Sequence, residues 1–258
     1  MYGPLPAQDS SVGGTGPWVN ASDVIDFAPG SAIPSHLVYW RYPDPSSFQV
    51  SPRHDHPNSL RIRPSVYNIT GNSSFTPEDS LSLIMRRQSH TLFTFNVDLA
   101  YNPKVIGEEA GLTLFLTQFQ HIDLGVTRVS SRQNKKGELS LRFRVEGRGN
   151  ENGTLPETKV IPVPRSWQSD SSIELQIQAV SETSYCFSAA SSRNRSDRLS
   201  LGCAPATILS GGTGAMTGTL VGTYATSNGV IGNTNAYFSR WRYSGHGQGI
   251  GDGWIVTA

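Results

Sequence analysis

Residues 81–125, LSLIMRRQSHTLFTFNVDLAYNPKVIGEEAGLTLFLTQFQHIDLG, contain two strongly patterned segments joined by turn residues. Apolar and polar side chains alternate through residues 93–99, which is the period of a strand with one buried face. Asn, Pro and Gly residues at 102–107 interrupt the pattern, as expected of a turn. The leucines of residues 112–116 then place a second apolar row against the same core. The stretch therefore predicts two adjacent antiparallel strands.

Further strands are predicted on both sides of this stretch. Side chains alternate between the two faces in the same way through residues 38–42 and 60–62. Residues 173–178 place Ile, Leu and Ile on one face and Glu and Gln on the other. Residues 236–243, AYFSRWRY, are predicted to form the last strand. This succession of short strands without helical periodicity indicates an all-β fold, a two-sheet antiparallel β-sandwich.

A hairpin is predicted around the Asn-Lys-Lys-Gly turn at residues 134–137. Apolar residues alternate with polar ones from 139 to 146, which indicates one buried face and one wet face. Arg142 and Arg144 lie on the polar face. We therefore expect their side chains to be solvated charges.

The composition and net charge of the chain bear on which classes of function are expected. The chain has 258 residues, of which 16% are charged, and its formal net charge is +1. This balance gives no electrostatic case for binding nucleic acid or an anionic membrane. No apolar run approaches the ~18 residues of a membrane span. We expect neither a nucleic-acid partner nor a membrane partner.

Residues within 81–125 also carry a resemblance to a known protein family. MRRQSHTLFTFNVDL at 85–99, followed by EEAGLTLFL at 108–116, resembles the C-terminal β-sandwich of glycoside hydrolase family 43, of the fungal β-xylosidase and α-L-arabinofuranosidase type. The resemblance implies a concanavalin A-like jelly roll. In that family an N-terminal five-bladed propeller carries catalysis on three carboxylic acids, and the substrates are xylan and arabinoxylan-type carbohydrates.

The sandwich is expected to occupy most of this chain. We assign residues 1–22 to a linker-like segment, 23–243 to the sandwich and 244–258 to a Gly-rich tail. Five propeller blades would need about 200 residues of repeats, and no such period is present. We therefore expect a chain without the catalytic propeller, whose partner is that propeller in cis or lost.

The resemblance also points to a loop. Family sandwiches carry a Gly-Gly-Phe-Thr-Gly type loop whose aromatic side chain reaches the propeller's active-site pocket. The matching stretch here is GAMTG at 214–218, which places Met216 at the aromatic position. Arg86 and Arg87 are further candidates for the pocket edge, although neighbours on a strand point to opposite faces. The alternative is a structural ion pair with one of the following carboxylates: Asp98, Glu108 or Glu109.

The alternative hypothesis, a stand-alone lectin-like carbohydrate-binding protein, depends on the aromatic residues. Tyr39 and Trp40 are candidates for a sugar-stacking platform, with Trp40 also a candidate for contact with substrate at the pocket edge. Trp167 and Trp241 are further candidates for a sugar-binding sheet face. Aromatic side chains more commonly pack in the protein core.

Cys186 and Cys203 are the only cysteines, and they lie symmetrically about a turn near residue 194. Residues in such positions face each other across an antiparallel hairpin, so a disulfide is expected, with two reduced buried cysteines as the alternative. Five Asn-X-Ser/Thr sequons favour a secreted, glycosylated protein, although residues 1–11 do not have the pattern of a signal peptide. The sequons are at Asn20, Asn68, Asn72, Asn152 and Asn194.

Catalytic and metal motifs are weak or missing. His54, Asp55 and His56 suggest metal ligands, but a zinc site needs a complete ligand set, so we expect a solvated loop and no metal or cofactor. Structural calcium has no support from the sequence. The adjacent Glu108 and Glu109 cannot form the opposed carboxylate pair of a glycosidase. A cryptic enzyme would need such a pair in a cleft, so we expect no complete hydrolase machinery in this chain.

Overall fold

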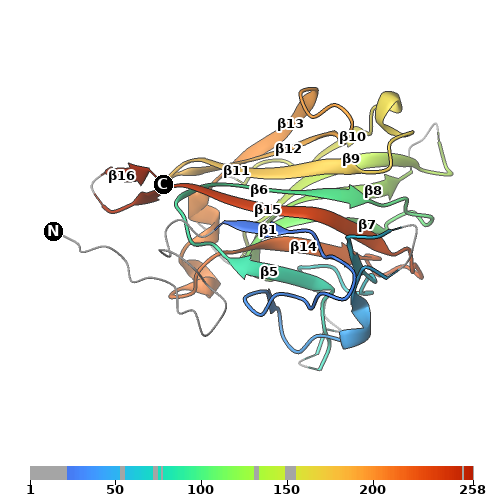
Figure 1. Ribbon diagram of the computed structural model, residues 1–258, viewed down its shortest axis with the longest axis horizontal. Helices are drawn as coiled ribbons and strands as arrows, with labels where there is room; N and C mark the ends of the chain where they lie inside the picture. Colours follow the sequence, from blue (N-terminus) through green and yellow to red (C-terminus); the bar gives the residue numbers. More distant parts are fainter. Residues whose placement is uncertain are drawn as a thin grey trace.

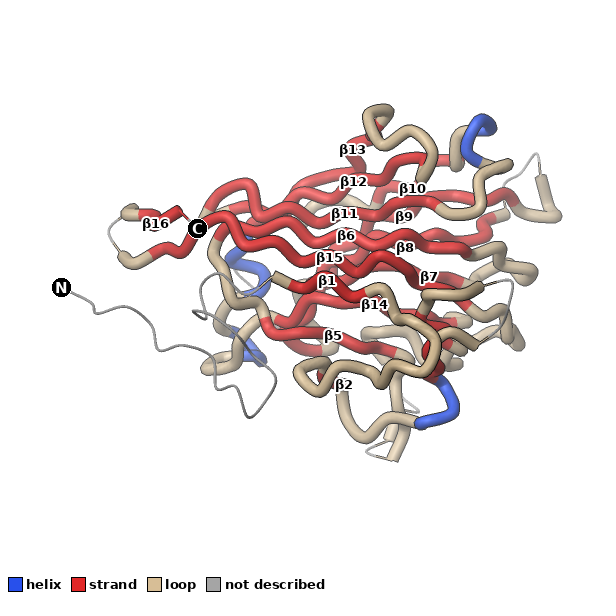
Figure 2. Tube along the Cα trace, in the orientation of Figure 1, coloured by secondary structure: helices blue, strands red, loops and turns tan. Residues whose placement is uncertain are grey.

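A computed structural model describes residues 22–52, 56–71, 75–76, 78–130, 134–148, 155–251 and 253–257. Within them the chain forms two antiparallel sheets packed face to face (Figure 1). Figure 2 shows that helix is confined to short pieces between strands. The predicted all-β sandwich is confirmed. The short 3-10 helices are η3 (Pro45–Ser47), η4 (Arg165–Trp167), η5 (Ala206–Leu209) and η6 (Gly212–Gly214).

The first sheet has the strand order β13-β12-β11-β6-β15-β4-β3, and β1 and β16 also pair with β15. The long strand β15 therefore joins β1 and β16, the first and last strands, to the middle of the sheet. The strands of this sheet are β1 (Asp23–Ile25), β3 (Phe48–Val50), β4 (Leu60–Ile62), β6 (Leu92–Ala100), β11 (Ile173–Ser181), β12 (Ser184–Ser191), β13 (Arg198–Pro205), β15 (Ala236–Gly249) and β16 (Ile255–Thr257).

The second sheet has the strand order β10-β9-β8-β7-β14-β5-β2. Its centre is the β7–β8 hairpin, flanked by β14 on one side and β9 on the other. The strands of this sheet are β2 (Val38–Tyr39), β5 (Leu83–Arg87), β7 (Glu109–Thr117), β8 (Gln120–Val129), β9 (Glu138–Glu146), β10 (Lys159–Pro162) and β14 (Leu220–Thr226).

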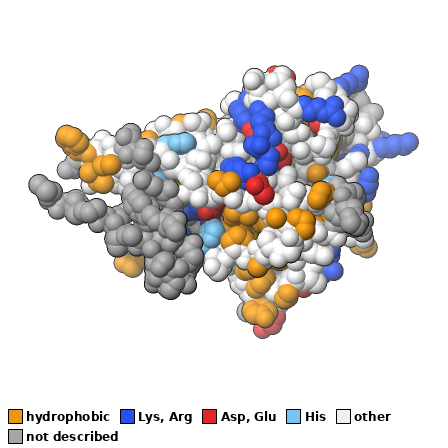
Figure 3. Space-filling view, in the orientation of Figure 1, with side chains coloured by type: hydrophobic (Ala, Val, Ile, Leu, Met, Phe, Trp, Pro, Cys, Tyr) orange, Lys and Arg blue, Asp and Glu red, His pale blue; other side chains and the backbone are white. Residues whose placement is uncertain are grey.

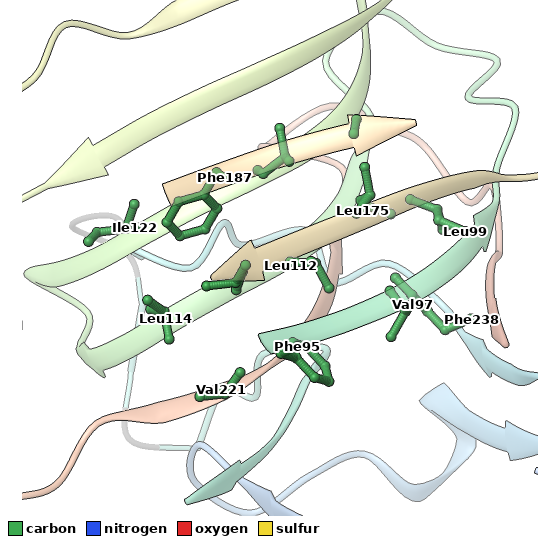
Figure 4. Close-up of a cluster of buried hydrophobic side chains, with 14 of the residues drawn as sticks. Phe95, Val97, Leu99, Leu112, Leu114, Ile122, Leu175, Phe187, Val221 and Phe238 are labelled. Carbon is green, nitrogen blue, oxygen red and sulfur yellow. The ribbon is translucent and has the colours of Figure 1, made fainter. Parts of the chain in front are cut away.

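The main core lies between the two sheets. Phe95, Val97 and Leu99 of β6 are at most 1% exposed and face Leu112 and Leu114 of β7 (Figure 4). The alternating pattern of residues 93–99 thus has the predicted buried face. Each such side chain contributes roughly 1.5–3 kcal/mol when it is removed from water.

A smaller apolar cluster covers the outer face of the second sheet. Ile69 and Leu81, from the segment that connects β4 to β5, pack there against Phe115 and Tyr224. A hydrogen bond of 3.0 Å from Thr226 Oγ1 to the Tyr67 carbonyl also ties this covering segment to the sheet. Central strands of the second sheet are therefore buried on both faces, as in a three-layer arrangement.

This covering layer corrects the prediction for Arg142 and Arg144, whose side chains are only about one-fifth exposed. Arg142 forms an ion pair with the buried Glu109, and Arg144 Nη2 lies 2.7 Å from the buried Asp123. The predicted alternation of apolar and polar residues on β9 is confirmed. The polar face is a charged network packed against neighbouring strands, and it is not a solvated face.

Two predicted strand boundaries also differ. The strand predicted over 38–42 is only two residues long, because Arg41 adopts a positive φ of 65°. The last strand does not end at residue 243. Instead β15 continues to Gly249 and turns back into β16, so much of the predicted tail 244–258 is paired strand.

The predicted disulfide is present. Cys186 of β12 lies directly opposite Cys203 of β13, and the two are bonded. We expect that replacing both cysteines with serine lowers the free energy of unfolding by about 3 kcal/mol, because the bridge restricts the unfolded chain. Chemical denaturation of the oxidised, reduced and Cys186→Ser/Cys203→Ser forms measures this. Equal stability of the three forms would contradict the expectation.

Candidate functional site at loop 210–219

Loop 210–219 joins η5 to β14 at the end of the sandwich that holds the β7–β8 turn. Its centre is the short helix η6, and the loop closes on itself through Gly214 N to the Gly211 carbonyl at 3.1 Å. Gly214 leaves no room for a side chain, because an added Cβ would lie 2.4 Å from the Leu116 side chain. The first glycine of the GAMTG stretch is therefore required by close packing.

Gln120, the first residue of β8, fixes this loop. Its side chain is wholly buried. Its Nε2 donates to the carbonyls of Ile208 at 3.0 Å and Gly211 at 3.1 Å, and its Oε1 accepts from Thr213 Oγ1 at 2.7 Å and Gly214 N at 3.1 Å. One amide thus satisfies three groups of the loop and one of η5, which gives the loop a defined shape.

The loop presents Met216 to solvent. Its side chain is fully exposed, and its φ is +65°, a left-handed conformation that is unusual for a residue with a side chain. Strained residues held by a rigid frame occur mainly at functional sites. The loop therefore holds a flexible apolar side chain at a fixed position, where it is suited to contact another surface.

We expect Gln120→Ala to lower the free energy of unfolding by about 2 kcal/mol, because three groups of the loop and the Ile208 carbonyl of η5 lose their partner. It should also make loop 210–219 more sensitive to limited proteolysis. Denaturant unfolding and mass-spectrometric mapping of the cleavage sites measure the two effects. Gln178→Ala, at an exposed position of β11, is the matched control and should change neither.

Arg87 lies at the same end of the sandwich. It is exposed at the end of β5, where it pairs with Leu220 of β14, and the next residue, Gln88, donates its N–H to the Thr219 carbonyl at 2.9 Å. The structure therefore brings Arg87 and the Met216 loop together. Their proposed contact with a substrate stays a prediction.

Arg86 points the other way, into the molecule. Its Nη1 lies 2.9 Å from Asp23 Oδ1, its Nη2 donates to Ser89 Oγ at 2.8 Å, and its guanidinium stacks 3.7 Å from the Tyr243 ring centroid. The structural ion pair expected for this arginine exists, but its partner is Asp23. The three carboxylates suggested from the sequence are engaged elsewhere: Asp98 with Arg195 and Arg240, Glu108 with loop groups, and Glu109 with Arg142.

Core packing explains most of the aromatic candidates. Trp241 is fully buried and Trp167 is 3% exposed. Trp40 packs edge-on against Phe115 at 5.1 Å. Tyr39 packs against Phe48 at 5.0 Å. These four residues do not form an exposed aromatic platform on either sheet.

The outer face of the first sheet is occupied by charges. Figure 3 shows Lys and Arg side chains gathered there around acidic ones. Arg195 bridges Asp98 at 2.7 Å and Glu174 at 2.9 Å, and Arg240 adds a contact to Asp98 at 3.2 Å. The arginines are therefore paired with carboxylates on their own sheet.

Asp123 is the centre of a buried polar network that sequence reasoning missed. Arg144 Nη2 lies 2.7 Å and His121 Nδ1 2.9 Å from its Oδ2, and Thr113 Oγ1 donates to its Oδ1 at 2.8 Å. Burial alone raises the pKa of Asp123, but the charges of His121 and Arg144 lower it to about 2. Thr70 Oγ1, 3.0 Å from His121 Nε2, links the network to the covering segment.

The sequons and the metal candidate are only partly within the described residues. Asn194 is exposed in the β12–β13 turn, and Asn68 is half-buried. Asn20, Asn72, Asn152, His54 and Asp55 lie outside the described residues, while His56 stacks on Tyr237 with ring centroids 3.8 Å apart. In the described part of the chain, no three His, Cys, Asp or Glu side chains gather as metal ligands. Its helices are also too short to cross a membrane.

Comparison with solved structures gives enzymes of glycoside hydrolase family 43. GH43B of the Bacteroides ovatus xyloglucan PUL shares 26% identity with a TM-score of 0.64, over 86% of this chain and 38% of that one. The xylan β-1,4-xylosidase from Bacillus halodurans C-125 shares 22% identity with a TM-score of 0.65, over 86% and 38%. The chain spans well under half the length of these enzymes.

A third structure, a functionally unknown protein from Saccharomyces cerevisiae, shares the fold at 13% identity with a TM-score of 0.54, over 82% of this chain and 97% of that one. The comparison with curated proteins gave no match. The family model for the beta xylosidase C-terminal concanavalin A-like domain matches residues 27–244. The chain therefore belongs to this family, the concanavalin A-like C-terminal module of family 43 xylosidase-type enzymes.

Proposed function

We propose that this chain is the accessory sandwich of a family 43 glycoside hydrolase of the β-xylosidase or arabinofuranosidase type, acting on xylan or arabinoxylan. It braces the catalytic propeller, and loop 210–219 closes one side of the propeller's pocket. The chain itself supplies no complete hydrolase machinery. Family membership over residues 27–244 supports this role, as does the greater length of the related enzymes.

The single observation that carries the proposal is the exposure of Met216 on a fixed loop. Neither the contact of an apolar side chain with water nor a left-handed backbone conformation is favourable. An exposed apolar side chain that is held rigidly in this way is typical of a surface that a partner covers. Methionine tolerates an imperfectly matched surface because its side chain is flexible. The same residue occupies the pocket-facing position of the loop to which the family resemblance points.

The test is binding of the purified chain to the propeller of a family 43 β-xylosidase expressed without its own sandwich. We expect a stable complex that Met216→Asp weakens at least tenfold, because a charge is then desolvated in the contact. Ile231→Asp is the matched control, since Ile231 is equally exposed but lies in the loop before β15. Absence of a complex, or equal weakening by both variants, would contradict the proposal.

We further propose that the protein works outside the cell. The disulfide between Cys186 and Cys203 supports an oxidising compartment, and exposed Asn194 supports glycosylation. Mass spectrometry of the protein from its native source tests this. Unmodified Asn194 together with free thiols at both cysteines would contradict it.

A second candidate function is a stand-alone carbohydrate-binding protein. The yeast neighbour supports it in one respect, because nearly the whole of that chain is covered by this fold. Within the part of the chain that the structure describes, neither sheet face carries the aromatic platform that was expected for such a protein.

A further inference from the structure

The hairpin formed by β15 and β16 extends beyond the sandwich (Figure 1). Residues 247–251 and 253–257 make its two sides. Near the tip, Ile250 N donates to the Trp254 carbonyl at 3.0 Å, and Trp254 N donates to the Gly251 carbonyl at 2.9 Å. The family model ends at residue 244, so family membership assigns no role to this hairpin.

One face of the hairpin is apolar and exposed. Gln248 lies opposite Val256 in the strand register, and the same register places Ile250 opposite Trp254. Alternate residues of a strand share a face, so Ile250, Trp254 and Val256 lie together. Their side chains are 50%, 72% and 55% exposed, and Figure 3 shows apolar side chains at this tip. Neighbouring exposed apolar side chains, unlike scattered single ones, indicate an interaction surface.

The base of the hairpin is fixed. Gly249 N donates to Thr91 Oγ1 at 2.8 Å, which ties the hairpin to the segment that precedes β6. Gly247 leaves no room for a side chain, because an added Cβ would lie 2.7 Å from Ile255. The two sides of the hairpin therefore pack closely. An apolar face on a fixed support loses little conformational entropy when a partner covers it.

The hairpin and loop 210–219 lie at the same end of the sandwich. Segment 88–91, which connects β5 to β6, contacts both of them: Gln88 N donates to the Thr219 carbonyl at 2.9 Å, and Thr91 accepts from Gly249. The Cα atoms of Gln88 and Thr91 are at most about 11 Å apart, the length of an extended chain. The hairpin and the loop therefore fit within one interface of ordinary size.

The composition of the hairpin suits an uncharged partner surface. Residues 247–257 contain one charged residue, Asp252, which lies outside the described residues. The apolar face built by Ile250, Trp254 and Val256 offers no group to pair with a charge of the partner. Covering a charge with this face would therefore be costly. The matching surface is an apolar patch.

The size of the hairpin favours a partner that also contacts loop 210–219. A stable interface takes about 20–30 residues from each side, and the tip of one hairpin supplies only a small part of them. A dimer of this chain built on the hairpin alone would be weak. The neighbouring loop, with its exposed Met216, supplies more of the same kind of surface.

Building on the proposed accessory role, we propose that the β15–β16 hairpin is a second docking element for the catalytic propeller. Ile250, Trp254 and Val256 pack on an apolar patch of the propeller, beside the contact made by loop 210–219. Trp254 is the centre of this contact, because large aromatic side chains contribute most to the affinity of protein interfaces.

The test is titration of the purified chain with a family 43 propeller from the same source, expressed without its own sandwich. We expect Trp254→Asp to weaken the complex roughly tenfold or more, because a charge replaces an apolar contact. Ile231→Asp should leave the affinity unchanged, since Ile231 is exposed before the start of β15 and the hairpin follows its end. Both variants should keep the Tm of the free chain, because both side chains are exposed.

Hydrogen exchange of the wild-type chain gives a second measurement. Backbone amides of the hairpin should exchange more slowly in the complex than in the free chain, and equal exchange would overturn the inference. A complex that Met216→Asp weakens and Trp254→Asp does not would overturn it too, while the accessory role would stand. Absence of any complex would contradict the accessory role and this inference together. A dimer of the free chain that Trp254→Asp dissociates would assign the hairpin to a second copy.

Discussion

Replacing Asp123 with alanine is expected to lower the free energy of unfolding by about 3–5 kcal/mol, the cost of breaking a buried ion pair. Asp123 is fully buried, and it holds Arg144 and His121 at 2.7 Å and 2.9 Å. Its removal leaves the Arg144 guanidinium and the His121 ring without the carboxylate that pairs with them. It also releases His121, which contacts the covering segment through Thr70.

Denaturant unfolding of Asp123→Ala measures this loss, with Asp26→Ala as the matched control. Asp26 pairs with Arg242 at an exposed position, so that variant should lose no more than about 1 kcal/mol. The double variant Asp123→Ala/Arg144→Ala should lose less than the two single variants added together, because they share one interaction. Equal losses in Asp123→Ala and Asp26→Ala would contradict a buried network.

The same residue predicts an acid-sensitive step. Its pKa of about 2 in the folded protein is below the ordinary value of 3.8. The unfolded chain therefore binds the proton more readily, so the stabilisation from Asp123 is complete above about pH 4 and is lost as the pH falls toward 2. Stability measured from pH 5 to about pH 2 should fall less steeply in Asp123→Asn than in the wild type. Identical slopes would assign the acid sensitivity to other carboxylates.

Replacing Arg86 with alanine is the second large effect, and we again expect a loss of about 3–5 kcal/mol. The guanidinium is buried between Asp23 of β1 and the Tyr243 ring of β15. Burial raises the pKa of Asp23, whereas a hydrogen bond from His36 and the charge of Arg86 lower it, so that it lies below its ordinary value. Among the described residues, this carboxylate without Arg86 keeps His36 and the Trp241 indole as partners.

Arg87→Ala provides the control, since Arg87 is the exposed neighbour on the same strand. It should change the free energy of unfolding by no more than about 0.5 kcal/mol. Hydrogen exchange should also show faster exchange at β1 in Arg86→Ala, because the ion pair joins that strand to β5. Similar stability in the two variants would contradict the structural role assigned to Arg86.

Strands were predictable wherever one face is apolar and the other polar. Residues 93–99 and 173–178 follow this rule, and β6 and β11 have the expected buried faces. Sequence alternation cannot distinguish a polar face that meets water from one that meets other charges. Arg142 and Arg144 were therefore assigned to solvent, although they pair with Glu109 and Asp123.

The sites were predictable only in part. The disulfide was predicted from the symmetry of its cysteines about a turn and is confirmed. The role of Met216 was inferred from a resemblance to a family loop and stays a prediction. Gln120 gave no signal, because a glutamine beside a turn is usually a solvated residue. The pairing of Asp23 with Arg86 also gave no signal, because 63 residues separate them in the chain.

The most direct measurement of the accessory role is hydrolysis of a chromogenic xyloside by the purified chain, alone and mixed with a family 43 propeller that lacks its own sandwich. We expect no turnover by the chain alone and a faster rate for the mixture than for the propeller alone. Met216→Asp should remove that increase, whereas Ile231→Asp should keep it. Turnover by the chain alone, abolished by replacing one of its carboxylates, would contradict an accessory role and assign catalysis to the sandwich.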